Sequence, residues 1–261
     1  MRDTPFPAIL APMQPALETG PIVEKILAVH GGRERWESLY ALEAEVSARG
    51  LLFAFKRRPA LCHASVTAMA REPHFLFHDY PSPGMTGELI GNEEVRILGS
   101  AGRVVERRAC PRAQMNAPGK LLGWDDLDFV YFGGYATWNY LMLPRLLLHD
   151  GVQVAAVPPR RGMPATWTCL RVRFPESLPT HSATQLFFFD ERLHLRRQEY
   201  VAEVVGAWAR AAHFCEDYRN FNGFKAPTRR RVRPMIPGNI ALPGPTLVAL
   251  DVHLIRAEYD P

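Results

Sequence analysis

The sequence alternates between apolar and polar side chains in one short segment after another, from about residue 41 to the carboxyl terminus. Residues 94–98, 152–157 and 166–174 are typical of these segments. An alternation with a period of two places successive side chains on opposite faces of a sheet, so each segment is predicted to be a strand. Turns that contain glycine or proline separate the segments. The sequence therefore predicts roughly ten or eleven consecutive antiparallel strands, beginning with a hairpin between residues 41–48 and 51–56.

A sheet of this length can bury its apolar face only by curving around other elements. We therefore expect a mainly β (α+β) fold, in which a single curved antiparallel sheet forms an open half-barrel with its concave face plugged by helices. With 47% hydrophobic and 22% charged residues among 261, the chain can bury a sizeable core. The expected organisation is one half-barrel domain over residues 21–261, preceded by an extended amino-terminal arm over residues 1–20.

Two helices are expected before the first strand. Pro21 favours a first helical turn, and Gly31 with Gly32 ends the helix, while the apolar residues between them share one face. A second short helix is expected over residues 33–40, with Trp36 facing inward.

A helical segment also interrupts the series of strands at residues 124–144. Aspartates at its start are candidate caps, Pro144 ends it, and we expect Gly133 and Gly134 to kink or split it. The segment is apolar and aromatic nearly all round, which predicts that protein surrounds it on every side.

Charge and targeting signals exclude several classes of protein. The net charge is only +4, and acidic residues are interspersed with the basic ones, so we expect no nucleic-acid partner. The basic run at residues 228–233 is interpreted as a solvated strand face. Prolines interrupt the amino terminus, which removes the apolar core of a secretory signal, and no run is long enough to span a membrane. We therefore expect a cytoplasmic protein, either a monomer or a homodimer.

The order of the expected elements resembles the bacterial lipoprotein-carrier superfamily of the LolA/LolB type. In that superfamily an amino-terminal helix ending in Gly-Gly precedes an open antiparallel half-barrel plugged by helices, and the resemblance covers residues 21–255. The lack of an export signal departs from the carriers, but the resemblance still implies a cavity for an apolar molecule. More specific sequence motifs resemble a group of bacterial conserved proteins of unclear role, at residues 131–141, 180–182, 195–200, 211–213 and 227–232.

Polar side chains concentrate on one face of three consecutive strands. If the connections are short, Ala183 lies opposite Tyr200, and a two-residue turn at Gly206 and Ala207 sets Tyr200 opposite His213. Directly opposed residues lie about 4.5–5.5 Å apart at Cβ, so a tyrosine hydroxyl and an imidazole can share a proton. The parity of this alignment places these side chains on one face: His181, Gln185, Gln198, Tyr200, His213, Cys215 and Asp217.

These residues are the candidates for catalysis. His213 would act as a general acid or base near neutral pH, Tyr200 would position or protonate an oxygen, and Asp217 would tune a nearby imidazole. His181 lies one diagonal step from Tyr200 and is the fourth candidate. The alternative is that all of them are cross-strand hydrogen-bond partners that hold the sheet together, and the sequence leaves both interpretations open.

The aromatic helical segment supplies the candidates for ligand binding. Buried tyrosine hydroxyls need partners, so several of them together predict an apolar cavity with a few polar groups, which is typical of a small-molecule pocket. The candidate ligand-binding residues, together with two glutamines of the polar strand face, are Trp138, Tyr140, Tyr131, Tyr135, Gln185 and Gln198.

No cofactor or metal is expected. His74 and His78 share a strand face, but the sequence contains neither HExxH nor a carboxylate triad to complete a site. GxGxxG, P-loop and GxSxG patterns are also missing. The four cysteines are far apart and form no CxxC pair.

Two functions therefore remain for a protein that holds a hydrophobic small molecule. The first is a metal- and nucleotide-independent enzyme, a cyclase or isomerase that works by shape and acid/base groups on an apolar metabolite of secondary metabolism. The second is a non-enzymatic carrier or sensor of a lipid-like ligand. A scaffold whose interior is filled by its own side chains is a third possibility.

Overall fold

The computed structural model describes residues 19–160 and 162–259, and one antiparallel sheet dominates it. The strands are β1 (Leu39–Arg49), β2 (Leu61–Met69), β3 (His74–His78), β4 (Thr86–Ile90), β5 (Glu94–Leu98), β6 (Val104–Ala109), β7 (Gln153–Val157), β8 (Thr168–Arg173), β9 (Thr184–Phe189), β10 (Leu195–Val201), β11 (Arg210–Phe221), β12 (Phe224–Ile236), β13 (Ile240–Ala241) and β14 (Val248–Tyr259).

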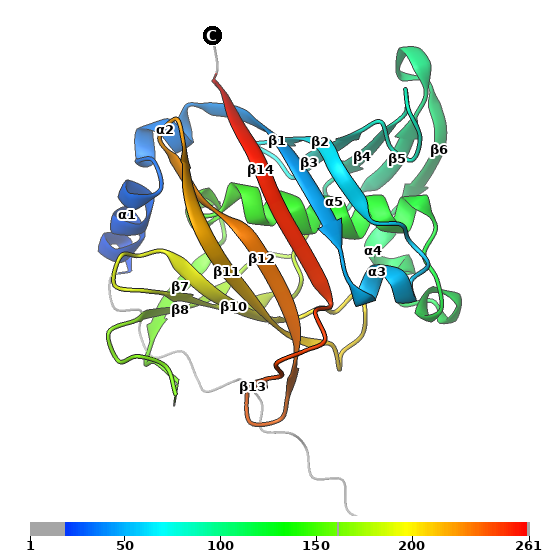
Figure 1. Cartoon of the computed structure of the whole chain (residues 1–261). Coiled ribbons are helices and arrows are strands. Elements are labelled where there is room, and N and C mark those ends of the chain that lie inside the picture. The colour runs from blue at the N-terminus through cyan, green and yellow to red at the C-terminus, as the bar shows by residue number, and fades with distance from the viewer. Residues whose placement is uncertain (1–18, 161, 260–261) are drawn as a thin grey trace, which may run out of the picture.

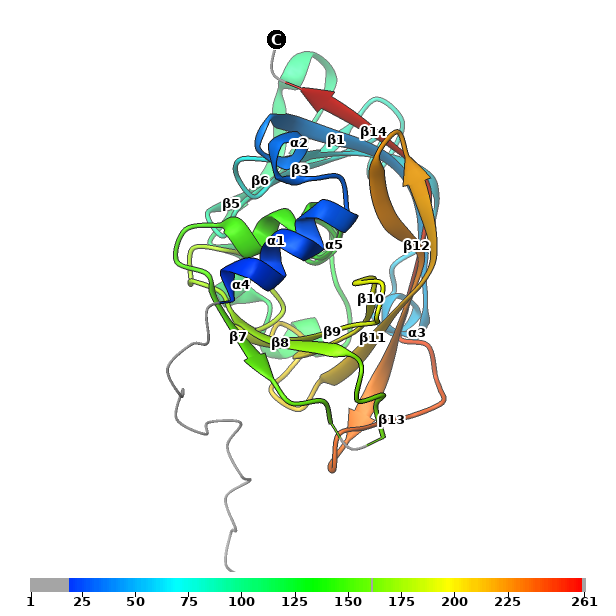
Figure 2. The ribbon, with the colours of Figure 1, turned by 90° about the vertical axis from the view of Figure 1, so that its left-hand side faces the viewer.

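The helices lie mainly on one side of this sheet. They are α1 (Gly20–Val29), α2 (Arg33–Glu37), α3 (Leu51–Phe55), α4 (Pro111–Gln114) and α5 (Asp126–Met142), with 3-10 turns η1 (Ser100–Gly102), η2 (Pro118–Leu121) and η3 (Arg145–Leu148). Figure 1 shows α5 crossing behind the strands, and Figure 2 shows the sheet curving around α1 and α5.

The sheet confirms the predicted half-barrel. Its strand order is β6-β5-β4-β3-β2-β1-β14-β12-β11-β10-β9-β8-β7, with β13 added beside β12, and every pairing among the described residues is antiparallel. The strands β6 and β7 form its two edges, so the sheet is not closed. The described residues form 14 strands rather than ten or eleven, and the strands that the sequence pattern did not indicate, β4 and β13, are only five and two residues long.

The first predicted hairpin is wrong. Residues 51–56 do not form a strand: β1 is followed directly by the short helix α3, and Gly50 adopts a φ of 142° at the junction. The run LLFAF has no alternation, and the backbone N–H groups of Leu51 and Leu52 donate to the carbonyls of Thr246 and Leu247. Helix α3 therefore lies beside the start of β14 and buries Phe53, whereas Leu51 and Phe55 stay exposed.

Helix α5 is the buried helix that the sequence predicts, but its two glycines do not kink it. The helix is continuous through Gly133 and Gly134. A Cβ atom on Gly133 would lie 3.1 Å from Cζ of Phe77, and one on Gly134 would lie 3.2 Å from Cβ of Leu89. The glycines therefore let the helix approach β3 and β4 closely, and the local cost of glycine in a helix is offset by packing.

The start of α5 is fixed by the aspartates that the sequence marks as caps. The side chain of Asp125 accepts a hydrogen bond from the backbone N–H of Asp128, and the side chain of Asp128 accepts one from the N–H of Asp125. This reciprocal arrangement is a capping box, which satisfies two backbone donors that the first turn leaves free. Lys120 and Arg108 bind the same two carboxylates.

The connection between β10 and β11 is longer than a two-residue turn. The backbone N–H of Ala202 donates to the carbonyl of Ala209, and the intervening residues form further turns. As a consequence Tyr200 pairs with Ala211, two residues before the expected partner His213. A displacement by two residues changes the neighbours of a side chain but leaves it on the same face of the sheet.

The structure bears on the expected amino-terminal arm, the second helix and the absence of a membrane-spanning segment. Residues 1–18 of the expected amino-terminal arm lie outside the described residues, and Gly20 already begins α1. The second helix ends at Glu37, with Trp36 buried as expected, and β1 begins at Leu39. No helix in the described part of the chain is long and apolar enough to cross a membrane.

Candidate functional site

The concave side of the sheet contains a cavity of about 220 Å³. Its walls come from β1, α3, α5, the turn between β10 and β11, β12 and β14, which lie far apart in the sequence. Trp208 lines the cavity and is 75% exposed, so the cavity reaches the surface beside this indole. Most of the wall is apolar, and its large aliphatic and phenyl side chains include Leu52, Phe53, Phe77, Phe129, Phe132 and Leu250.

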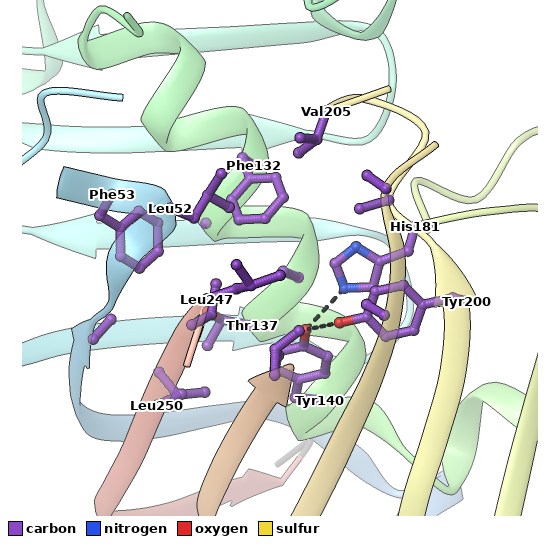
Figure 3. A pocket seen from close by; sticks show the side chains of 18 of the residues that line it. Leu52, Phe53, Phe132, Thr137, Tyr140, His181, Tyr200, Val205, Leu247 and Leu250 are labelled. Carbon is purple, nitrogen blue, oxygen red and sulfur yellow. Dashed lines mark hydrogen bonds between the residues drawn. The ribbon is translucent and has the colours of Figure 1, made fainter. Parts of the chain in front are cut away.

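One wall of the cavity carries polar groups. Figure 3 shows His181, Tyr140 and Tyr200 together, across the cavity from Leu52 and Phe53 of α3. Tyr140 comes from the last turns of α5 and Tyr200 from β10, while His181 precedes β9. Helix α5 and the sheet therefore both contribute polar side chains to this wall.

His181 connects the tyrosines of α5 and β10. Its Nε2 lies 2.8 Å from the hydroxyl of Tyr140, and its Nδ1 lies 3.1 Å from the hydroxyl of Tyr135. The hydroxyls of Tyr140 and Tyr200 are 3.3 Å apart. The ring of Tyr200 stacks on the imidazole, with centroids 4.0 Å apart and planes inclined by 7°. These four side chains form a single hydrogen-bonded chain that ends at the cavity.

The cluster is uncharged at neutral pH because it is buried. Burial, together with the smaller effect of the charge of Arg112, lowers the pKa of His181 to about 3. Burial also raises the pKa of Tyr200 well above its ordinary value and raises the pKa of Tyr140. An efficient general acid or base has a pKa close to the working pH. At pH 7 these groups therefore form hydrogen bonds, but their pKa values lie too far from the working pH for efficient proton transfer.

The predicted partnership of His213 with Tyr200 is wrong. Their ring centroids are 6.4 Å apart, and the imidazole of His213 instead meets the ring of Tyr140 edge-on at 4.5 Å. His213 is fully buried, does not line the cavity, and neither of its ring nitrogens has a hydrogen-bond partner among the described residues. Burial lowers its pKa well below the ordinary value. His181 therefore takes the place beside Tyr200 that the alignment assigned to His213.

Asp217 does not join the cluster. Its side chain is 59% exposed, and its carboxylate lies 3.8 Å from Nη1 of Arg229 rather than beside an imidazole. The backbone of Asp217 has a φ of 53°, which interrupts the regular alternation of β11. The expectation that Asp217 tunes a histidine is therefore wrong. It assumed that β11 is a regular strand as far as Asp217, and the strand is irregular there.

The other predicted ligand-binding residues are buried but, apart from Tyr140, do not line the cavity. The indole N–H of Trp138 donates to the carbonyl of Met69 at 2.8 Å, and the hydroxyl of Tyr131 donates to Asn92 at 2.8 Å. Both side chains thus join α5 to neighbouring segments. The predicted role of Trp138 in the cavity wall is wrong, because this face of α5 points toward the end of β2.

The two glutamines form a pair of their own. The amide of Gln198 donates to the amide oxygen of Gln185 at 2.6 Å, and the amide of Gln185 donates to the carbonyl of Ser182 at 3.0 Å. Neither side chain lines the cavity. Through the bond to Ser182 they hold the segment that carries His181, so they help to position the polar side chains of the cavity wall.

Arg230 is a buried cation within the basic run 228–233, so the interpretation of that run as a solvated strand face is wrong at this position. Its side chain is 4% exposed and lies against the ring of Tyr140, with the guanidinium carbon 5.0 Å from the centroid. One nitrogen donates to the Tyr140 carbonyl at 2.9 Å, and another lies 3.3 Å from the sulfur of Cys215. A cation near the carboxyl end of α5 interacts favourably with the helix dipole. Arg230 therefore positions Tyr140.

The described residues contain no group of three metal-ligating side chains placed to hold a metal ion. His74 and His78, which share a strand face, have separate partners: Nε2 of His74 lies 2.9 Å from Glu88, and Nε2 of His78 lies 2.8 Å from Thr67.

Sequence analysis did not identify most of the residues that line the cavity. Phe53 and Leu52 were assigned to a strand, and Val205 and Trp208 were assigned to the strands on either side of a two-residue turn, although both lie in the longer connection between β10 and β11. The inward face of β14, which includes Leu250, carried a detectable signal because its alternation marks the buried side. No local pattern distinguishes a side chain that packs against protein from one that faces an empty space.

The sequence matches no protein-family model, and no curated protein shows significant similarity to it. Its fold is similar to solved structures. One is a LolA superfamily protein from Nitrosomonas europaea, with a TM-score of 0.52, 11% identity, and coverage of 94% of this chain and 96% of that one. Another is a DUF1329 family protein from Desulfovibrio piger, with a TM-score of 0.51, 10% identity, and coverage of 92% and 93%.

These comparisons establish the architecture of the protein. The chain has a LolA-like fold, as the sequence resemblance implied, and the similarity extends over nearly the whole chain. At 10–11% identity it reports on the fold and not on the activity.

Proposed function

We propose that this protein binds an apolar small molecule inside its half-barrel. The observation that carries the proposal is the cavity of about 220 Å³, with a predominantly apolar wall and one polar patch made by Tyr140, His181 and Tyr200. An engineered apolar cavity of about 150 Å³ takes up benzene. A larger space of the same character has room for a bicyclic or medium-length aliphatic molecule, and release of water from its apolar wall favours binding.

The test is a titration with N-phenyl-1-naphthylamine, whose fluorescence increases in apolar surroundings. Ala136 lies on α5, is 5% exposed and lines the cavity, so Ala136→Phe should fill the space and weaken binding at least about tenfold. Ala165 is exposed and outside the cavity, so Ala165→Phe is the matched control and should bind like the original protein. Equal binding by both variants would show that the probe binds elsewhere.

A second candidate function is catalysis of a cyclisation or isomerisation of the bound molecule. The observation that favours it is the convergence of two tyrosine hydroxyls and an imidazole on one wall of a predominantly apolar cavity. A cavity that holds a flexible molecule in a reactive shape accelerates ring closure, and a hydrogen bond to an oxygen stabilises developing negative charge. Because the pKa of His181 is lowered to about 3, shape and hydrogen bonding would contribute more than proton transfer.

Enzyme and carrier are distinguished by the double variant Tyr140→Phe/Tyr200→Phe. The protein is incubated with a small-molecule extract, and both bound and newly formed compounds are followed by mass spectrometry. An enzyme forms a product that the double variant does not form, although the variant still binds the substrate. A carrier or sensor of a lipid-like ligand releases the compound unchanged from both proteins.

A further inference from the structure

The hydrogen-bonded chain of the polar wall can run in only two directions. Tyr135, His181, Tyr140 and Tyr200 are joined in this order by contacts of 3.1, 2.8 and 3.3 Å. A neutral imidazole has one N–H donor and one acceptor nitrogen, so it donates to one tyrosine and accepts from the other. The direction at His181 therefore decides which hydroxyl hydrogen at the ends of the chain is left over.

The first direction leaves an unsatisfied donor in the core. If Nδ1 of His181 carries the hydrogen and donates to Tyr135, the hydroxyl hydrogen of Tyr135 needs another acceptor. Among the described residues no hydrogen bond other than that to His181 is formed by this hydroxyl. Tyr135 is fully buried and does not line the cavity, so the unsatisfied hydroxyl would be shut away from any ligand. Buried donors without partners are costly and rare.

The second direction satisfies every buried donor of the chain. Tyr135 donates to Nδ1 of His181, and the hydrogen on Nε2 is donated to the hydroxyl oxygen of Tyr140. The hydroxyls of Tyr140 and Tyr200 then share one hydrogen bond between them, which leaves one hydroxyl hydrogen over. Both tyrosines line the cavity. The spare donor therefore faces the space in which a ligand would lie.

From this arrangement we infer that the ligand carries a hydrogen-bond acceptor, such as a carbonyl oxygen, and places it against the hydroxyls of Tyr140 and Tyr200. The inference rests on the proposed binding function and adds the chemical class of the ligand. No carboxylate lines the cavity within the described part of the chain, so a cationic group would lack a counterion. Arg230 is covered by the ring of Tyr140, whereas Arg210 lines the cavity and donates to the side-chain oxygen of Asn239 at 2.6 Å.

The experiment compares two probes of the same shape, 2-acetylnaphthalene and 2-ethylnaphthalene, which differ in one carbonyl oxygen. Affinities for both are measured by calorimetry with the original protein and with Tyr140→Phe/Tyr200→Phe. We expect the double variant to lose about 2- to 12-fold in affinity for the ketone, the range of one net hydrogen bond, and to bind the hydrocarbon at least as tightly. The carbonyl stretch of the bound ketone should lie at lower frequency in the original protein than in the double variant.

The matched control is Tyr218→Phe. Tyr218 is half-buried, its hydroxyl donates to the carbonyl of Leu195 at 3.3 Å, and the residue does not line the cavity. This variant should keep the preference and the stretching frequency of the original protein. Because Tyr200→Phe alone leaves the hydroxyl of Tyr140 free to donate, the single variant should retain part of the preference for the ketone.

The outcomes separate this inference from the proposed function. If both probes bind but the double variant changes neither the ratio of their affinities nor the carbonyl frequency, the inference is overturned and the binding function stands. If neither probe binds to the original protein, both are overturned. Selective loss of the ketone in the double variant supports both.

Discussion

Lowering the pH should destabilise this protein because three of its histidines are buried without charge. Burial lowers the pKa of His181 to about 3 and that of His30 to about 4, and it lowers the pKa of His213 well below the ordinary value. In the unfolded chain the same imidazoles have a pKa of about 6.5. The unfolded state therefore binds protons that the folded state does not bind between about pH 6.5 and pH 4.

The sign and the size of the effect follow from this difference. Above pH 6.5 these histidines are neutral in both the folded and the unfolded state, so they do not lower the free energy of unfolding. Below pH 6.5 each histidine lowers the free energy of unfolding by up to about 1.4 kcal/mol per pH unit, until the pH approaches the folded-state pKa. At pH 5 the loss is about 2 kcal/mol for each histidine, or about 6 kcal/mol for three. This is comparable to the whole stability of a typical domain.

The assay is urea unfolding at 25 °C, followed by tryptophan fluorescence at pH 8 and pH 5. His213→Leu removes one of the three groups, and its ring nitrogens have no hydrogen-bond partner among the described residues. The difference in stability between the two pH values should shrink by about 2 kcal/mol in this variant. His30→Gln should reduce it by a similar amount. Leu89→Ala, at a fully buried position that does not titrate, should lower stability at both pH values and leave their difference unchanged.

An unchanged difference in His213→Leu would refute the reasoning. It would mean that the imidazole of His213 binds a proton in the folded protein, so that burial does not hold it neutral. The same result in both histidine variants would contradict the assignment of uncharged histidines to the interior.

Three further predictions concern helix α5 and are measured by urea unfolding at pH 8. Trp138→Ala should cost about 3–5 kcal/mol, because the indole is 1% exposed, yet N-phenyl-1-naphthylamine should still bind, since this side chain does not line the cavity. Gly133→Val should cost about 1–3 kcal/mol or more through collision with β3, whereas Gly119→Ala, with no atom near its Cβ, should be close to neutral. Arg230→Met should cost about 1–3 kcal/mol because it leaves the carbonyl of Tyr140 without its donor; an unchanged midpoint in this variant would contradict the positioning role.

Much of the fold could be predicted because its signals are local. Alternation with a period of two marks the strands, and an apolar run with capping aspartates marks α5, so the half-barrel around a buried helix follows from neighbouring residues alone. The failures are also local in origin. Residues 51–55 have no periodicity to choose between helix and strand, and tertiary hydrogen bonds to Thr246 and Leu247 accompany the helix.

The candidate site was predicted only in part. His181, Tyr200 and Tyr140 were among the candidates, and the structure brings them together, but their partners were misassigned. A turn longer by a few residues moved Tyr200 away from His213, although the parity of the strands kept both on the buried side. A register can be argued from parity, whereas the length of a turn depends on contacts that the strand pattern does not record.

The sequence by itself determined which side chains of a regular strand share one face of the sheet, because the direction of a side chain in such a strand depends only on its position in the alternation. Only the tertiary structure decided which inward side chains pack against protein and which face the cavity. The reason is that a cavity is not a property of any one residue. It is the space left between β1, α3, α5 and β14, so it is defined only by the relative positions of all four elements.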